Sequence, residues 1–334
     1  SLRSRKLKNI QADIKSGNFK QVYLLYGEEA YLKQQYKQNL VKALNPDGDT
    51  MNFNHYEGKG IDVKQLIDLC ETMPFFAERR VVLLEDTGFF KNKCEELADY
   101  MKELPDYLYL VFAETEVDKR NRMYKAVKAC GSIAEFIRQD EKTLMRWAAG
   151  ILGKAGKKIT QRDMELLLTK TGTDMGNLRM EMEKLISYTE GRDVVTAEDI
   201  EEICTTQTTN RIFDMVRAVT EKNQKRALEL YYDLLTLKEP PMRILFLLAK
   251  QYRQLLLAKQ FAAAGLAQTE IASKLGVPGF VVRNITTCAR AYTISELEQA
   301  VKDFVDAEES VKTGRLEDKL SVELLIIKYS SKVK

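Results

Sequence analysis

The chain has 334 residues, of which 45% are hydrophobic and 30% charged, and its 52 basic and 49 acidic residues give a formal net charge of +3. This composition excludes a disordered or fibrous protein, and the length predicts more than one domain. Because the charge is nearly balanced, any contact with nucleic acid has to come from a local basic patch. The basic, polar N-terminus lacks a signal-like apolar stretch, and no apolar run is long enough to cross a bilayer. We therefore expect a cytoplasmic protein with no membrane partner.

The first 140 residues alternate short apolar runs with amphipathic stretches. The apolar runs predict strands at residues 22–26, 51–57, 81–86, 107–113 and 132–137. Between the second and third runs, Val63, Leu66, Ile67 and Cys70 follow helical spacing. Strands separated by helices indicate parallel crossovers and a sheet that is covered on both faces. Residues 1–140 are therefore predicted to form an α/β domain.

After Asp140 the strand signals end and helix boundaries dominate. N-cap residues precede three predicted helices: Thr160, Asp174 and Thr196. Asp199, at the third helical position after Thr196, strengthens the last of these helix starts. The polar, aperiodic segment "TTQTTN" (205–210) marks a boundary, so residues 141–208 are assigned to a small helical domain.

Residues 209–334 are predicted to form a third, all-helical domain. A long helix is expected over 240–265, where the segment begins with proline and ends at glycine, and Ser295 with Glu298 suggests a capping box. The helices carry wide apolar faces, which include Ile244, Leu247, Leu248, Leu255 and Ile326. Such faces belong first to a core and second to a subunit interface.

The turn after the first strand is where a parallel α/β domain holds a nucleotide phosphate, and here it reads "GEEAYLKQ". Gly27 and Lys33 match the phosphate-loop pattern, but Leu32 and Gln34 replace its second glycine and its hydroxyl residue. The acidic pair after Gly27 places carboxylates where phosphates would bind. We expect no nucleotide-binding residue and no cofactor. A degenerate phosphate-loop NTPase remains the alternative, because the strand "VVLLED" ends in acidic residues as a Walker B strand does.

Metal and catalytic residues are not predicted. The five cysteines form no CxxC pair, and the single histidine, His55, has no companion at metal-ligand spacing. His55 lies in an alternating strand pattern and is expected to be structural.

The stretch "ETMPFFAERRVVLLED" (71–86) places Met73, Phe75 and Phe76 around a proline. One interpretation has the phenylalanines seal the edge of the core, since phenylalanine is usually buried. The other has them exposed on a turn, because proline biases the preceding residue away from helical geometry and adjacent side chains on a turn rarely both face inward. Such a cluster suits insertion into a pocket on a partner. Arg79 and Arg80 either pair with acidic residues on that partner's rim or form a solvated edge.

A second candidate surface is basic. The run "DKRNRMYKAVKAC" (118–130) mixes basic and aromatic residues, and Lys119, Arg120 and Arg122 are its candidate DNA contacts. The alternative is an ordinary solvated helix face.

Taken together, the order and spacing of "VYLLYGEEAYL", "MPFFAERRVVLLE", "NLRMEMEKLISY" and "ESVKTGRLEDKLSVELLIIKY" resemble the delta-subunit family of bacterial DNA polymerase III, which belongs to the clamp loader. The resemblance spans nearly the whole chain. It implies an AAA+-like N-terminal domain without ATP binding, a small helical lid and a helical collar. It also implies a non-catalytic subunit of a DNA-directed nucleotidyltransferase complex.

The same resemblance implies partners and a mechanism. Met73, Phe75 and Phe76 correspond to the family's hydrophobic wedge, which binds the sliding clamp (the beta subunit) and opens the ring for loading onto primed DNA in replication. The collar is expected to contact other loader subunits of the delta prime and tau/gamma types, and primed DNA is reached through the complex. The rivals are an ATP-hydrolysing loader subunit and a helical nucleic-acid-binding module.

Overall fold

The computed structural model describes residues 2–206 and 208–331 of the chain. It divides into two compact units, residues 1–139 and 140–334, which we call the N-terminal and C-terminal units. Gln207, inside the predicted boundary segment 205–210, lies outside the described residues. In the described part of the chain, no helix is both long enough and apolar enough to span a membrane.

The N-terminal unit is built on a five-stranded, fully parallel sheet in the order β2-β3-β4-β1-β5. Its strands are β1 (Val22–Tyr26), β2 (Phe53–Glu57), β3 (Arg80–Glu85), β4 (Leu108–Glu114) and β5 (Ser132–Glu135). The predicted α/β class is confirmed, and each predicted strand is found with its ends displaced by no more than two residues.

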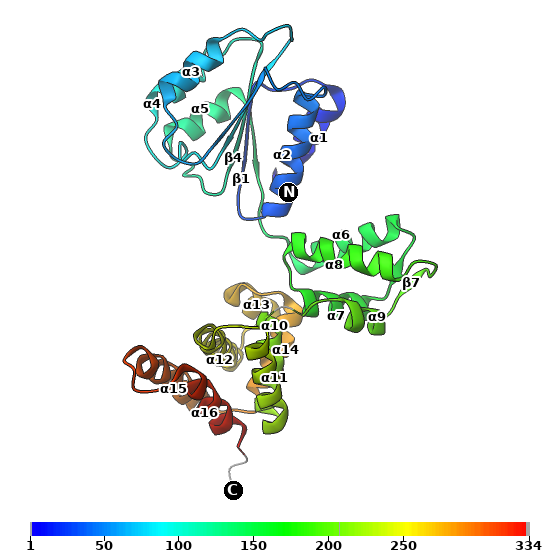
Figure 1. The fold of residues 1–334 in the computed structure, drawn as a ribbon, viewed down its shortest axis with the longest axis vertical. Coiled ribbons are helices and arrows are strands. Elements are labelled where there is room, and N and C mark those ends of the chain that lie inside the picture. Colours follow the sequence, from blue (N-terminus) through cyan, green and yellow to red (C-terminus); the bar gives the residue numbers. More distant parts are fainter. Residues whose placement is uncertain (1, 207, 332–334) are drawn as a thin grey trace. The chain divides into compact units, whose positions relative to one another are not determined.

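Helices cover both faces of this sheet, as Figure 1 shows. One face carries α1 (Leu2–Ser16) and α2 (Ala30–Leu44); the other carries α3 (Val63–Glu71), α4 (Glu95–Tyr100) and α5 (Arg122–Cys130). All five residues of β1 are buried, and they alternate between the two cores: Leu24 packs in the core beneath α3, and Leu25 in the core beneath α2. A strand buried on both faces has to be apolar throughout, which explains the uninterrupted run "VYLLY".

The parallel topology separates two kinds of loop. Every strand begins at one edge of the sheet and ends at the other. The turn from α3 into β3 therefore lies at the edge where strands begin, whereas the loop from β1 into α2 lies at the opposite edge. The turn that contains Phe75 and Phe76 thus lies at the opposite end of the N-terminal unit from the loop after β1, which we call the failed phosphate loop because it lacks two residues of the phosphate-binding pattern.

The C-terminal unit contains two hydrophobic cores. The first is formed by α6 (Glu141–Lys154), α7 (Gln161–Thr171), α8 (Met175–Tyr188) and α9 (Ala197–Ile203). The predicted N-caps are confirmed, because the side chains of Thr160, Asp174 and Thr196 each accept a backbone N–H of the following helix. The expectation of no further strands is wrong, since β6 (Lys158–Ile159) pairs with β7 (Val194–Val195). A strand of two residues is too short to give an alternating hydrophobic pattern in the sequence.

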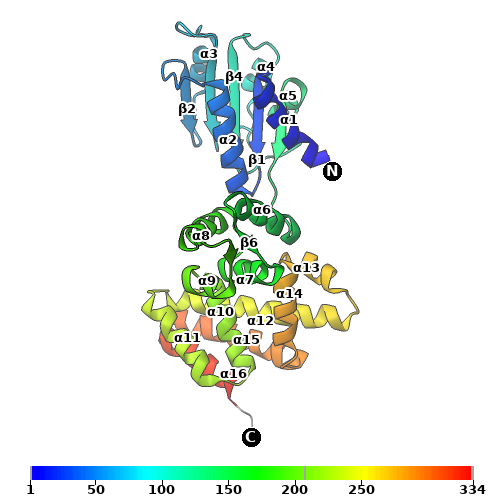
Figure 2. The same ribbon diagram turned by 90° about the vertical axis from the view of Figure 1, so that its right-hand side faces the viewer.

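The second core is formed by seven helices, and Figure 2 shows α12 running across the middle of this group. They are α10 (Thr208–Thr220), α11 (Gln224–Thr236), α12 (Pro241–Ala263), α13 (Gln268–Leu275), α14 (Gly279–Ala289), α15 (Ile294–Lys312) and α16 (Asp318–Ser330). The predicted capping box was placed two residues too late, because Thr293 and Glu296 form it. The predicted apolar faces are largely internal: Ile244, Leu248, Leu255 and Ile326 are buried, and Leu247 packs against them.

Two glycines of opposite surroundings provide a test of these packing contacts. A Cβ on Gly131 would lie 2.3 Å from the carbonyl oxygen of Val22, whereas a Cβ on Gly150, inside α6, would meet nothing within 4 Å. We expect Gly131→Ala to lower the free energy of unfolding by about 2–3 kcal/mol. Gly150→Ala should raise it by about 0.5–1 kcal/mol, because alanine loses less backbone entropy in a helix. Urea unfolding of both variants checks this, and equal effects of the same sign would contradict the described packing.

Candidate functional site: an exposed hydrophobic turn

The turn between α3 and β3 is shaped by its sequence. Asp62 caps α3 by accepting the N–H groups of Lys64 and Gln65. The helix stops at Thr72, which has an extended ψ of 121°, and Pro74 follows where it disfavours helical geometry at the residue before it. The chain therefore leaves the amphipathic helix abruptly and crosses to the start of β3.

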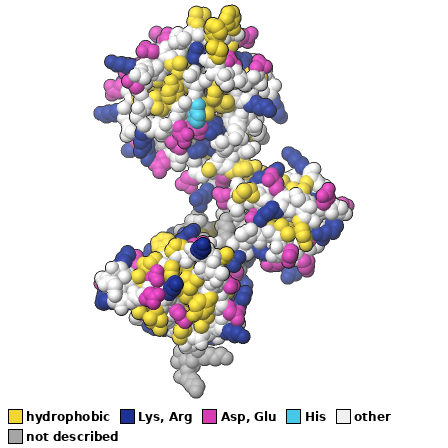
Figure 3. Space-filling view, viewed as in Figure 1, with side chains coloured by type: hydrophobic (Ala, Val, Ile, Leu, Met, Phe, Trp, Pro, Cys, Tyr) yellow, Lys and Arg dark blue, Asp and Glu magenta, His cyan; other side chains and the backbone are white. Residues whose placement is uncertain are grey.

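The three apolar side chains of this turn point into solvent. Met73 is 74% exposed, Phe75 56% and Phe76 95%, and the two rings meet edge to face with centroids 4.5 Å apart. Figure 3 shows hydrophobic side chains standing out from the upper end of the N-terminal unit, the end at which α3 lies in Figure 1. The interpretation that the phenylalanines seal the core is therefore wrong.

The structure adds Met51, which the sequence analysis did not single out, to this surface. Met51 is 65% exposed and precedes Asn52, whose side chain is bonded to the backbone of Phe75. Because Met51 is adjacent to Asn52 in the chain, it lies at the same edge of the sheet as the turn. We call Met51, Met73, Phe75 and Phe76 the apolar tip. A sequence signal for Met51 was lacking, because the approach of Asn52 to Phe75 depends on the pairing of β2 with β3.

Asn52 is buried and holds the backbone of the turn. Its Oδ1 accepts the N–H of Phe75 at 2.6 Å, and its Nδ2 donates to the carbonyl oxygen of Phe75 at 2.9 Å. The same Nδ2 donates to Asp49 at 2.5 Å. This hydrogen bond is the main reason that the pKa of the Asp49 carboxyl is lowered from its ordinary value.

Arg80 is also buried, which corrects its assignment as a rim or solvated residue. Its guanidinium donates to the carbonyl oxygens of Thr72 at 2.8 Å and Met73 at 3.3 Å, and to Asn54 Oδ1 at 3.2 Å. Arg79 is partly exposed, and its guanidinium stacks over two aromatic rings, those of Phe19 and Tyr109. A planar fork of donors explains why arginine suits the buried position.

Phe76 adopts a backbone conformation that is rare for an aromatic residue. Its φ is +49°, in the left-handed region. Such a conformation costs on the order of 1–3 kcal/mol and persists only where surrounding contacts impose it. The ring makes no core contact that offsets this cost, so the strain is associated with presenting the side chain to solvent.

The failed phosphate loop is occupied by the chain's own groups. Gly27 has a φ of +124°, and a Cβ there would lie 2.2 Å from the carbonyl oxygen of Phe136. The N–H of Glu29, at the start of α2, donates to that same oxygen at 3.1 Å. A backbone amide that a phosphate loop would offer to an anion is thus used internally.

The lysine of this loop is likewise engaged. Lys33 Nζ donates to the carbonyl oxygens of Glu114 at 2.9 Å and Gly27 at 3.4 Å, and burial lowers the pKa of this ammonium group. Burial raises the pKa of the Glu114 carboxyl, which accepts two hydrogen bonds from Thr87. His55 lies 3.0 Å from Glu85, and Figure 3 shows the histidine beside acidic side chains. These polar side chains therefore have hydrogen-bond or ion-pair partners within the fold.

The three candidate DNA contacts are each paired with a carboxylate. Lys119 pairs with Glu135 at 3.0 Å, Arg120 with Asp118 at 3.1 Å, and Arg122 with Asp99 at 2.7 Å. Their net field is therefore smaller than the basic sequence suggests. Lys119 and Arg120 follow β4 and so lie at the opposite edge of the sheet from the apolar tip. Their contact with DNA stays a prediction.

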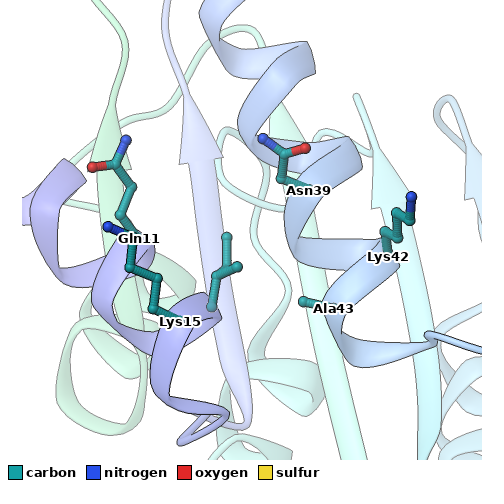
Figure 4. Close-up of a pocket in the computed structure, with 6 residues that line it drawn as sticks. Gln11, Lys15, Asn39, Lys42 and Ala43 are labelled. Carbon is teal, nitrogen blue, oxygen red and sulfur yellow. The ribbon is translucent and has the colours of Figure 1, made fainter.

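A shallow hollow of about 430 Å³ lies between α1 and α2, shown in Figure 4. It is lined by Gln11, Ile14, Lys15, Asn39, Lys42 and Ala43. The polar side chains on its walls are exposed, and the hollow has no buried polar group aimed into it. It is not connected to the apolar tip, because it lies on the α1/α2 face of the sheet.

The fold defines the class of the protein. A parallel sheet in the order β2-β3-β4-β1-β5, followed by a mostly helical unit, is an AAA+-like arrangement. Family models for "DNA polymerase III, delta subunit" and its C-terminal domain match residues 23–136 and 209–329. The chain belongs to the DNA polymerase III delta subunit family.

Individual relatives agree with this assignment. The DNA polymerase III subunit delta of Bacillus subtilis is 26% identical over 332 residues, covering 96% of this chain and 95% of that protein. A probable delta subunit of Aquifex aeolicus is 22% identical over 270 residues, covering 77% and 75%. The solved structure of the Bacillus subtilis DNA clamp loader delta protein superposes with a TM-score of 0.66 at 24% identity, covering 97% and 99%.

Substitutions at Phe76 test the strained backbone. We expect Phe76→Gly to be more stable than Phe76→Ala by about 1 kcal/mol, because glycine adopts a φ of +49° without a Cβ clash. At the neighbouring Ala77, which lacks a positive φ, Ala77→Gly should instead lower stability by about 0.5–1 kcal/mol. Chemical denaturation measures all three. A glycine variant at 76 that is less stable than the alanine variant would contradict the left-handed conformation.

Proposed function

We propose that this chain binds the sliding clamp through Met73, Phe75 and Phe76 and opens the ring for loading onto primed DNA during replication. The observation that carries the proposal is the exposure of three large apolar side chains on one turn of a well-packed unit. Exposed apolar clusters on monomers mark interaction sites. The similar Bacillus subtilis structure is that of a DNA clamp loader delta protein, which supports the choice of partner.

Magnitudes limit what this turn does alone. Burying each large apolar side chain contributes about 1.5–3 kcal/mol, so three contribute about 5–9 kcal/mol. Association costs an estimated 4–15 kcal/mol in lost freedom. The turn is therefore an anchor, and Met51 and contacts around it supply the remainder.

Ring opening requires a difference in affinity. A subunit that binds closed and opened clamp interfaces equally shifts nothing, however tightly it binds. We expect the apolar tip to fit the opened interface better, so that binding shifts the ring toward the open form. No bond is made or broken by the chain in this mechanism, and we propose no catalysis by its own residues.

The α10–α16 core is proposed to act as the collar that joins other loader subunits of the delta prime and tau/gamma types. Its surface carries large exposed apolar side chains: Tyr232, Leu237, Phe246, Val305, Leu320 and Leu324. Figure 3 shows hydrophobic side chains gathered on the face of this core that is turned toward the viewer. Helices whose outer faces only met water would be expected to carry polar side chains at these positions.

Removal of both rings tests clamp binding. Phe75→Ala/Phe76→Ala should weaken binding to a purified bacterial sliding clamp at least a hundredfold, because two buried rings contribute about 3–6 kcal/mol. Titration calorimetry measures the affinity, and circular dichroism checks that the fold is intact, as expected for side chains that are exposed.

The matched control is Phe246→Ala, since Phe246 is 64% exposed but lies on α12. This variant should bind the clamp normally and lose affinity for partner loader subunits. Equal clamp binding by the wild type and the Phe75/Phe76 variant would overturn the proposal.

Nucleotide addition tests the rival function, an ATP-hydrolysing subunit. Because the amide of Glu29 and the ammonium of Lys33 already bond carbonyl oxygens, we expect no affinity for Mg-ATP. A ligand at a hundred times its Kd would stabilise the fold by about 2.7 kcal/mol. We therefore expect millimolar Mg-ATP to leave the unfolding temperature unchanged. A concentration-dependent rise would favour the NTPase instead.

A further inference from the structure

We infer that Asn52 and Arg80 are positioning residues that hold the apolar tip in its clamp-binding shape before the clamp arrives. The inference rests on the proposed function and deepens it. Both side chains are buried, and both bond the backbone of the turn rather than its apolar side chains. Because both side chains are buried, we expect each to act through the backbone of the turn and not by direct contact with the clamp.

Asn52 acts on the turn as a neighbouring strand would. Its backbone carbonyl accepts the N–H of Val81, where the pairing of β2 with β3 begins. Its side chain meanwhile bonds both backbone groups of Phe75, at 2.6 and 2.9 Å. One residue thus ties Phe75, in the turn, and Val81, in β3, to the start of β2. The five residues between them are closed into a fixed loop that includes Phe76.

Arg80 fixes the other end of the turn. The last carbonyls of a helix have no partner within the helix, and a cation is favourable near them. The Arg80 guanidinium reaches back from the start of β3 to this end of α3, where it donates to the carbonyl oxygens of the C-cap residue Thr72 and of Met73, the residue after it. Arg80 thereby links the C-terminal end of α3 to the first residue of β3.

These polar contacts take the place of apolar packing. Met73, Phe75 and Phe76 are largely in solvent and contribute little to holding the loop. Phe76 also needs a left-handed φ of +49°, which a free loop would seldom adopt. Without Asn52 and Arg80 the turn would sample many shapes, and the apparent affinity falls in proportion to the binding-competent fraction.

The experiment compares Asn52→Ala and Arg80→Lys with the wild type for binding to a purified bacterial sliding clamp. Both variants should bind about tenfold more weakly, as when the competent fraction falls to about a tenth. Lysine keeps the charge of Arg80 but offers a point charge in place of the planar fork, so Arg80→Lys is the milder variant if Asn52→Ala folds poorly. Amide hydrogen exchange at residues 75–79 of the free chain should become faster in both.

A thermodynamic cycle separates positioning from general destabilisation. If Asn52 acts through the two rings, then Asn52→Ala should weaken clamp binding no further in the Phe75→Ala/Phe76→Ala background. Asn121→Ala is the matched control. The side chain of Asn121 also bonds backbone groups through both its Nδ2 and its Oδ1, but it lies at the start of α5, away from the turn. This variant should lose stability and keep its affinity for the clamp.

The outcomes are distinguishable. Wild-type affinity of Asn52→Ala and Arg80→Lys, with loss of binding in Phe75→Ala/Phe76→Ala, overturns the positioning role and leaves the proposed function standing. Additive losses in the cycle, or an equal loss in Asn121→Ala, also overturn it. Unchanged binding by the Phe75/Phe76 variant overturns both.

Discussion

The constraint on which the N-terminal unit depends is the parallel pairing of its strands. Parallel strands are joined only by crossovers, so helices must cover both faces and the sheet must be apolar on both sides. The same pairing sends every strand-to-helix loop to one edge and every helix-to-strand turn to the other. A chain of this class that no longer binds phosphate at one edge of the sheet can still present a functional turn at the other. Here the edge with the failed phosphate loop is closed by internal bonds, and the opposite edge carries the exposed apolar tip.

The closed edge and the open edge are built from different interactions. At the closed edge, Lys33 and the amide of Glu29 bond carbonyl oxygens of the chain, so donors that suit a phosphate have protein acceptors instead. At the open edge, Asn52 and Arg80 use buried polar groups to fix a backbone whose side chains stay in water. Buried donors of this kind are costly to leave unpaired, which gives the turn a defined shape without an apolar core beneath it.

Much of the fold was predictable from the sequence because its signals are local. Uninterrupted apolar runs located the strands, and Thr160, Asp174 and Thr196 located helix starts, since a cap depends on residues within one turn. For Phe75 and Phe76 the sequence left burial and exposure both open, and Pro74 together with their adjacency on a turn supported exposure of at least one ring. Met51 and the buried role of Arg80 were not predictable, because both depend on β2 and β3 lying side by side, and the sequence between them does not reveal that pairing. The predicted capping box differs from the observed one because Thr293 with Glu296 and Ser295 with Glu298 both fit the pattern, which by itself does not select between them.

The solvent exposure of the tip has a consequence for how this surface changes over time. Side chains in a core are constrained by selection on stability, since most substitutions there destabilise the fold. Phe76, at 95% exposure, contributes almost nothing to folding, and its left-handed backbone would accept glycine more readily than phenylalanine. Apart from the backbone effect of glycine at position 76, substitution of the exposed rings is thus expected to change stability little and to affect mainly the proposed interaction with the clamp. Under the proposed function, the rings of the tip could change together with the clamp pocket that binds them, whereas the buried Asn52 and Arg80 are constrained by the fold.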